Sequence, residues 1–146
     1  MLKHDNIEPT PRTDYVAIKD AKSYAVVVDP SRKLGWTKNS IEPWNENRSE
    51  DRIVEVLTEQ VSDAYLAHLR KIGISYIFGG KDRLNFTVVV EKPKNLFAID
   101  KLKLEGGGFL NGSFLNEGLI DELSLILVPI ADSASNSVTL FERAPF

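Results

Sequence analysis

Short apolar runs and one amphipathic stretch alternate along the first half of this 146-residue chain. Three runs predict strands, at Tyr24–Asp29, Ile53–Thr58 and Ile74–Phe78, because each is rich in β-branched or aromatic residues. Their nearly continuous apolar character is typical of strands in a parallel sheet that is covered on both faces.

Between the second and third runs, apolar residues recur with the period of an α-helix. The spacing predicts a helix over Ser62–Ile72, with Ser62 as its N-cap and Gly73 just beyond its end. A strand, a helix and a strand in this order make a βαβ unit, whose two strands are parallel.

The next segment combines conflicting signals. Phe86–Val90 has strand propensity. An alternating order of strands and helices, however, requires a crossover helix at this point. Pro93 opposes a long helix because an interior proline costs about 3 kcal/mol. We expect a helix over Asn85–Lys92 followed by a turn.

A second βαβ unit is expected over Leu102–Ile130. It would consist of a short strand at Leu102–Leu104, a run of three glycines, a helix at Phe109–Glu117 that ends at Gly118, and a strand at Ile120–Pro129. Residues 1–22 are predicted to form an N-terminal arm, and residues 23–146 a single α/β domain. The polar stretch from residue 34 to residue 51 is expected to be a loop with a short strand or turn near Trp36.

Composition excludes several classes of protein. The formal net charge of −3 argues against a nucleic-acid-binding surface. The absence of cysteine excludes disulfides and thiolate sites, and two distant histidines make a metal centre unexpected. No apolar run approaches the roughly 20 residues that span a bilayer, and no signal-peptide pattern follows Met1. We therefore expect a cytoplasmic protein whose partner is a small molecule.

The glycine run is the strongest chemical signal. Gly106, Gly107 and Gly108 would let backbone N–H groups approach a ligand closely, and the following helix would point its positive N-terminus at the same place. That arrangement suits a phosphate group. Glu105 would lie at the carboxyl end of a strand, where open α/β sheets bind ligands. A tight strand-to-helix connection without a ligand is the alternative.

Other candidates follow the ends of the earlier strands. A hydroxyl and a cation come directly after the first strand, a hydroxyl ends the second, and a glycine pair ends the third: Ser31, Arg32, Thr58, Gly79 and Gly80. The alternative for Ser31 and Arg32 is a solvated polar turn.

Three stretches together resemble the reductase domain of bacterial riboflavin biosynthesis, the RibD C-terminal domain. They are YAVVVDPSRKL, IVEVLTEQVSDAYLAHLRKIGISYIFGG and EGGGFLNGSFLNEGLIDELSLILVPI. The resemblance implies a dihydrofolate reductase-like fold, with three α/β/α layers and a mostly parallel sheet. It also implies an NADPH-dependent reductase that transfers hydride to a small heterocyclic substrate, such as a phosphoribosylamino-pyrimidine.

The resemblance implies roles for the candidate residues as well. Gly106–Gly108, with Phe109 and Leu110, would hold the cofactor phosphates. Thr58, Ser31 and Arg32 would line the adenosine end of the cofactor, and the glycine pair Gly79–Gly80 would also contact it. Glu105 would face the nicotinamide and the substrate.

Two segments of the family pattern have no counterpart here: an initial strand and helix with an SxDG-like segment, and a final strand or hairpin. We therefore expect either a fragment or a reduced relative, and a homodimer that pairs the exposed sheet edges. A non-catalytic nucleotide-binding or assembly module, with only the cofactor half of the fold, is the alternative function.

Overall fold

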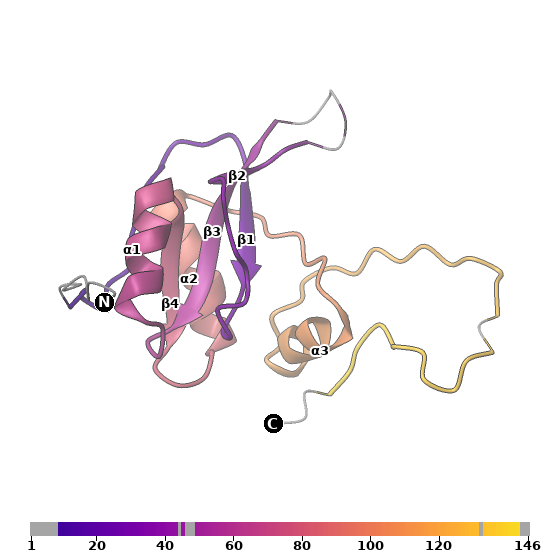
Figure 1. Cartoon of the computed structure of the whole chain (residues 1–146). Helices are drawn as coiled ribbons and strands as arrows, with labels where there is room; N and C mark the ends of the chain where they lie inside the picture. The colour runs from indigo at the N-terminus through magenta and orange to yellow at the C-terminus, as the bar shows by residue number, and fades with distance from the viewer. Residues whose placement is uncertain (1–8, 44, 46–48, 132, 144–146) are drawn as a thin grey trace. The chain divides into compact units, whose positions relative to one another are not determined.

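The computed structural model describes residues 9–43, 45, 49–131 and 133–143, and it divides the chain into two compact units between Ile99 and Asp100 (Figure 1). The expected single domain over residues 23–146 stays a prediction. Each unit is described here by itself.

The first unit is built on a mixed sheet with β3 (Asp51–Thr58) at its centre. Residues 54–56 of β3 pair in parallel with both β1 (Tyr24–Val28) and β4 (Ser75–Gly80), so these two strands lie on opposite edges of β3. The short β2 (Ser40–Ile41) pairs with the start of β3 in the antiparallel direction. The three predicted strands are confirmed, and β2 is the short strand expected in the polar loop.

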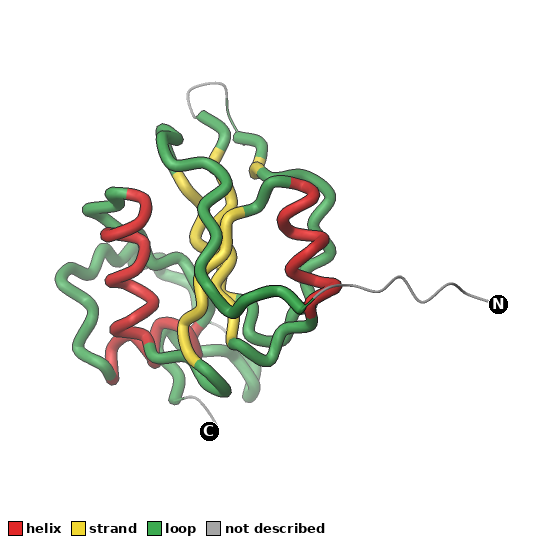
Figure 2. The backbone as a smooth tube through the Cα atoms, turned by 90° about the vertical axis from the view of Figure 1, so that its left-hand side faces the viewer, coloured by secondary structure: helices red, strands yellow, loops and turns green. Residues whose placement is uncertain are grey.

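Side chains of β3 alternate between the two faces of the sheet, and a helix covers each face (Figure 2). Ile53 and Leu57 pack with α1 (Asp63–Ile72), whereas Val54 and Val56 pack with α2 (Phe86–Phe97). The predicted α/β/α layering is confirmed for this unit.

The ends of α1 form as the sequence predicts. The Ser62 hydroxyl accepts a hydrogen bond from the Tyr65 backbone N–H and so caps the first turn. Gly73 ends the helix with φ of 76°, a left-handed conformation that glycine adopts at little cost.

Helix α2 is longer than expected, because it continues through Pro93 to Phe97. An interior proline costs about 3 kcal/mol. Burial of a Val or Phe side chain contributes about 1.5–3 kcal/mol, and Val89 and Phe97 are both buried against the sheet. Packing of this apolar face therefore offsets the proline and overrides the strand propensity of Phe86–Val90.

The predicted N-terminal arm is, over its described residues, part of the first unit. Tyr15 forms an antiparallel bridge with Tyr76 on the outer edge of β4. Arg12 forms an ion pair with Asp63 at 2.6 Å, which anchors the segment to the start of α1. The part of the arm from residue 9 onward therefore packs on the first unit.

The second unit contains α3 (Gly108–Asn116), which confirms the helix expected there, and Gly118 follows with φ of 65°. The predicted strands at Leu102–Leu104 and Ile120–Pro129 are wrong, because both stretches lack regular structure. A strand needs a hydrogen-bonded neighbour, and the described residues of this unit provide none. The apolar residues of the second stretch are exposed; Ile126 and Leu127 each retain 88% of their accessible surface.

No helix in the described part of the chain has the length and apolar character needed to cross a membrane.

Candidate functional site

The carboxyl ends of β1, β3 and β4 meet at one edge of the sheet, as expected for parallel strands. Thr58, at the end of β3, is paired with Gly80 and is 5% exposed. The backbone N–H of Glu59 donates to the Gly80 carbonyl at 3.1 Å. The structure therefore brings together the predicted residues that end the second and third strands.

The loop after β1 reaches the same edge. Arg32 has φ of 54°, and its Nη1 donates to the Gln60 carbonyl at 2.6 Å, just beyond β3. Ser31 and Arg32 are both exposed to solvent. The cation that was predicted for the cofactor's adenosine end is thus held by the chain itself at Gln60, in the turn that follows Thr58.

The glycine pair at the end of β4 is required by the chain's own packing. A Cβ on Gly80 would lie 1.9 Å from the Arg83 carbonyl oxygen, and one on Gly79 would lie 2.8 Å from the Leu84 side chain. The Gly79 carbonyl also accepts a hydrogen bond from the N–H of Asn85, the N-cap residue of α2. These contacts explain both glycines without a ligand, and their predicted cofactor contact stays a prediction.

In the second unit, the three consecutive glycines have different surroundings. A Cβ on Gly106 would collide with Leu110, and one on Gly108 would lie 2.5 Å from the Thr139 carbonyl oxygen. Nothing lies within 4 Å of a Cβ built on Gly107. Gly107 is the N-cap residue of α3 and makes no side-chain capping bond. The open approach to this helix N-terminus is therefore at Gly107.

Glu105 and Phe109 flank that approach and are exposed. The Glu105 carboxylate forms an ion pair with Lys103 at 2.6 Å, and 65% of its side-chain surface is accessible. Phe109 is 51% exposed, whereas Leu110 is partly buried beside Gly106.

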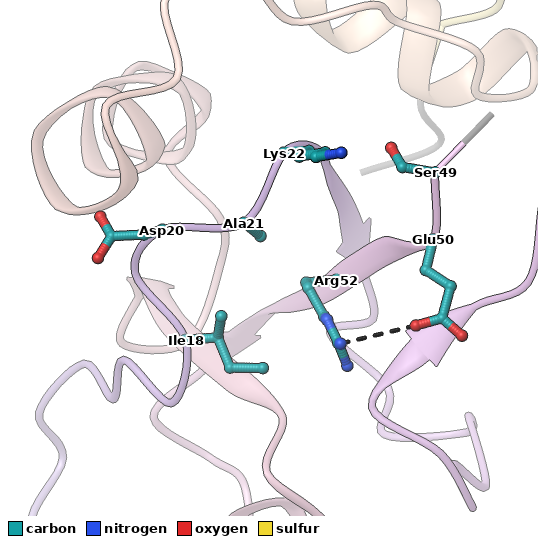
Figure 3. A pocket seen from close by; sticks show the side chains of 7 residues that line it. All are labelled: Ile18, Asp20, Ala21, Lys22, Ser49, Glu50 and Arg52. Carbon is teal, nitrogen blue, oxygen red and sulfur yellow. Dashed lines mark ion pairs between the residues drawn. The ribbon is translucent and has the colours of Figure 1, made fainter.

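A hollow of about 370 Å³ lies elsewhere in the first unit, close to the amino ends of β1 and β3 (Figure 3). Its lining includes two acidic and two basic side chains, and one pair of them, Glu50 and Arg52, is joined at 3.6 Å. The charges balance, so the hollow has no net preference for an anion such as a nucleotide phosphate. Its lining residues are Ile18, Asp20, Ala21, Lys22, Ser49, Glu50 and Arg52.

A buried acidic group under α1 was missed by the sequence analysis. Glu55 lies on the α1 face of β3 between Ile53 and Leu57, and it is fully buried. Its Oε1 is 2.7 Å from the Tyr65 hydroxyl. The only available signal was a charged residue inside the apolar run IVEVLT.

Burial has the largest effect on the pKa of Glu55. It raises the pKa of Glu55 to about 7, and the nearby Asp29 carboxylate adds to the shift, against a lowering by the Tyr65 hydrogen bond. Burial and the Glu55 carboxylate together raise the pKa of Tyr65, which therefore stays protonated. The site thus contains a carboxyl group that titrates near neutral pH.

A mixed sheet with a parallel core, covered by a helix on each face, makes the first unit an α/β fold. The family model described as the RibD C-terminal domain matches residues 8–146, nearly the whole chain. The chain therefore belongs to the RibD C-terminal domain family, which confirms the resemblance and the fold class. Members are reductase-type oxidoreductases of riboflavin biosynthesis. A comparison with curated proteins gave no match.

We expect Gly80→Ala to lower the free energy of unfolding by about 1–3 kcal/mol, because the added methyl group would collide with the Arg83 backbone. Urea unfolding followed by circular dichroism would measure the change. Gly35→Ala is the matched control, since nothing lies within 4 Å of its Cβ position. Equal stabilities of the two variants would contradict the packing role of Gly80.

We expect the free energy of unfolding to fall as the pH rises from about 4.5 to about 7 and then to level off. Glu55 binds its proton more tightly in the folded state, where its pKa is about 7, than in the unfolded chain, where glutamate has a pKa of about 4.3. This loss amounts to about 4 kcal/mol for the single group.

Urea unfolding at about pH 5 and about pH 8 would measure this dependence. Glu55→Gln should remove most of it, whereas Glu59→Gln, on the neighbouring turn, should leave it unchanged. A wild-type slope that persists in Glu55→Gln would show that another group is responsible.

Proposed function

We propose that this chain acts as an NADPH-dependent reductase that transfers hydride to a small heterocyclic substrate of the phosphoribosylamino-pyrimidine type. The observation that supports the proposal most directly is the open N-terminus of α3 at Gly107. Membership in the RibD C-terminal domain family supplies the reaction class.

The N-terminus of α3 fits a phosphate group. The first backbone bond within the helix runs from the Asn111 N–H to the Gly107 carbonyl, so the N–H groups of the first turn point beyond the helix. Those of Gly108, Phe109 and Leu110 would donate to phosphate oxygens, and the positive end of the helix dipole would add to the attraction. Gly107 leaves room for the phosphate because a side chain there would occupy the same space.

The other residues of the proposed site would contact either the adenosine end or the nicotinamide end of the cofactor. Thr58, Ser31 and Arg32 would bind the adenosine end, since the Arg32 guanidinium has donors beyond the one that bonds to Gln60. Glu105 would face the nicotinamide and the substrate. The nicotinamide supplies the hydride when bound, and the protein supplies position and electrostatics.

A non-catalytic nucleotide-binding or assembly module is the second candidate. The exposure of Glu105 and its ion pair with Lys103 favour it, because a reacting carboxyl group is usually desolvated. The two candidates share the cofactor contact and differ in turnover. Loss of NADPH absorbance on addition of the pyrimidine substrate would support the reductase, and binding without turnover would support the module.

We expect NADPH to bind saturably to the 146-residue chain and Gly107→Asp to abolish the binding, because the carboxylate would repel the phosphate. Calorimetry would measure the affinity. Asn116→Asp places the same charge at the other end of α3 and should bind like the wild type. Absence of binding by the folded wild type would overturn the cofactor proposal, and unchanged binding by Gly107→Asp would overturn the site.

We also propose that the chain forms a homodimer. The segment Leu123–Ile130 exposes most of its apolar side chains, and within the described residues β1 pairs only with β3, so that its outer edge is unpaired. The segment of one copy would pair along β1 of the other, which would bury the apolar side chains and satisfy the backbone groups. A cytoplasmic location stays a prediction.

Sedimentation analysis should give the wild type a mass of two chains. Leu127→Lys should give the mass of one chain, because a buried lysine would oppose the contact. Val138→Lys is the control, since Val138 is similarly exposed, at 83%, but lies outside the segment. A wild type that stays monomeric as its concentration is raised would contradict the dimer.

A further inference from the structure

The loop Pro30–Trp36, which we call the β1 loop, is fastened over the α1 face of the sheet by polar contacts. The Leu34 N–H donates to Asp29 Oδ2 at 2.9 Å, and the Leu34 carbonyl lies 3.0 Å from the Tyr65 hydroxyl. The Trp36 carbonyl lies 2.9 Å from His68 Nε2. Asp29, at the start of the loop, is itself buried.

The Tyr65 hydroxyl faces two acceptors but carries one proton. It lies 2.7 Å from Glu55 Oε1 and 3.0 Å from the Leu34 carbonyl oxygen, and it can donate to one of them at a time. When Glu55 is protonated, its O–H donates to the neighbouring Asp29 carboxylate, and its other oxygen is an uncharged, weaker acceptor, so that Tyr65 donates to Leu34. When Glu55 is a carboxylate, it accepts the Tyr65 proton, since a bond to a charged acceptor is the stronger one. The Leu34 carbonyl then loses its donor.

Groups on every neighbouring element face Glu55. On the strands beside it, Val27 of β1 is apolar, and the Tyr76 hydroxyl of β4 accepts a hydrogen bond from Arg70 Nε. Asp29 lies at the end of β1 and disfavours a second negative charge. From the β1 loop, the Trp36 indole approaches Glu55 and, more weakly than the other groups, lowers the pKa of that carboxyl group.

Two buried atoms of this cluster lack a hydrogen-bond partner within the described structure, Glu55 Oε2 and Trp36 Nε1. A buried carboxylate needs several donors to be stable, and an unpaired oxygen makes the charged form costly. The protonated form of Glu55 therefore suits the closed loop, because ionisation would place a second buried negative charge beside the Asp29 carboxylate, which holds the Leu34 N–H.

We propose that Glu55 is a proton-operated latch for the β1 loop. Its protonated carboxyl group directs the Tyr65 hydroxyl to the Leu34 carbonyl and holds the loop closed. Its carboxylate takes that donor away and releases the loop from α1. The loop also holds Ser31 and Arg32, so the latch would tune NADPH affinity with pH; that consequence rests on the proposed function, whereas the latch itself does not.

The test uses Trp36 as a fluorescent reporter in the absence of NADPH. The background variant is Trp44→Phe, which removes the other tryptophan, a residue outside the described part of the chain. Emission should shift to longer wavelength in a single step near neutral pH as the loop opens and water reaches the indole. Glu55→Gln has nearly the same shape as protonated glutamic acid but cannot ionise. This variant should therefore show no step and should keep the short-wavelength emission at every pH.

His68 is the competing source of such a step, because its imidazole contacts the Trp36 carbonyl. His68→Gln should keep the step, whereas Tyr65→Phe, which lacks the hydroxyl, should give long-wavelength emission at every pH. A step that survives in Glu55→Gln, or disappears in His68→Gln, would overturn the latch.

Amide hydrogen exchange of the wild type gives a second readout that needs no variant at Glu55. The protection factor of the Leu34 N–H should fall about tenfold or more as the pH passes through neutral, while that of Leu66, inside α1, should stay constant. Equal protection of Leu34 on both sides of neutral pH would also overturn the proposal. Because NADPH is absent, neither result depends on cofactor binding.

Discussion

Burial of β3 on both faces and both edges is the constraint on which the first unit depends. Each edge of β3 is paired in parallel, and each face is covered by a helix, so its side chains from Ile53 to Thr58 are all buried. Parallel pairing brings the strand ends to one edge, where Thr58, Gly80 and Arg32 come together. The same burial makes Glu55 costly to ionise and therefore responsive to pH near neutral.

Local patterns were sufficient for most of the first unit. The apolar runs predicted β1, β3 and β4, and Ser62 and Gly73 marked the ends of α1 because capping is a local effect. The length of α2 could not be predicted from Pro93 alone, since burial of Phe97 outweighs the proline. The strand at Ile120–Pro129 was predicted from propensity, but pairing depends on a neighbour that propensity does not reveal.

At the candidate site, too, the residue types could be read from the sequence, whereas the surroundings of each residue could not. Glycine was read as a sign of ligand approach at Gly80, Gly107 and Gly108, yet only at Gly107 is the space beside the backbone open. Gly80 and Gly108 give room to carbonyl oxygens of the chain itself. The Glu55 cluster went unnoticed because its members come from a strand, a loop and a helix, and only the fold brings them within hydrogen-bonding distance.

The exposed segment of the second unit has a consequence for how the chain behaves at high concentration. Leu123–Val128 has no charged residue and alternates leucine with serine, isoleucine and valine, the composition of segments that stack into cross-β fibrils. Asp121 and Glu122 precede it and Pro129 follows it, and such gatekeeper residues oppose stacking by charge repulsion and by the missing N–H. Three residues at the borders of one short segment, outside every strand and helix described, thus oppose the stacking that the composition of the segment favours.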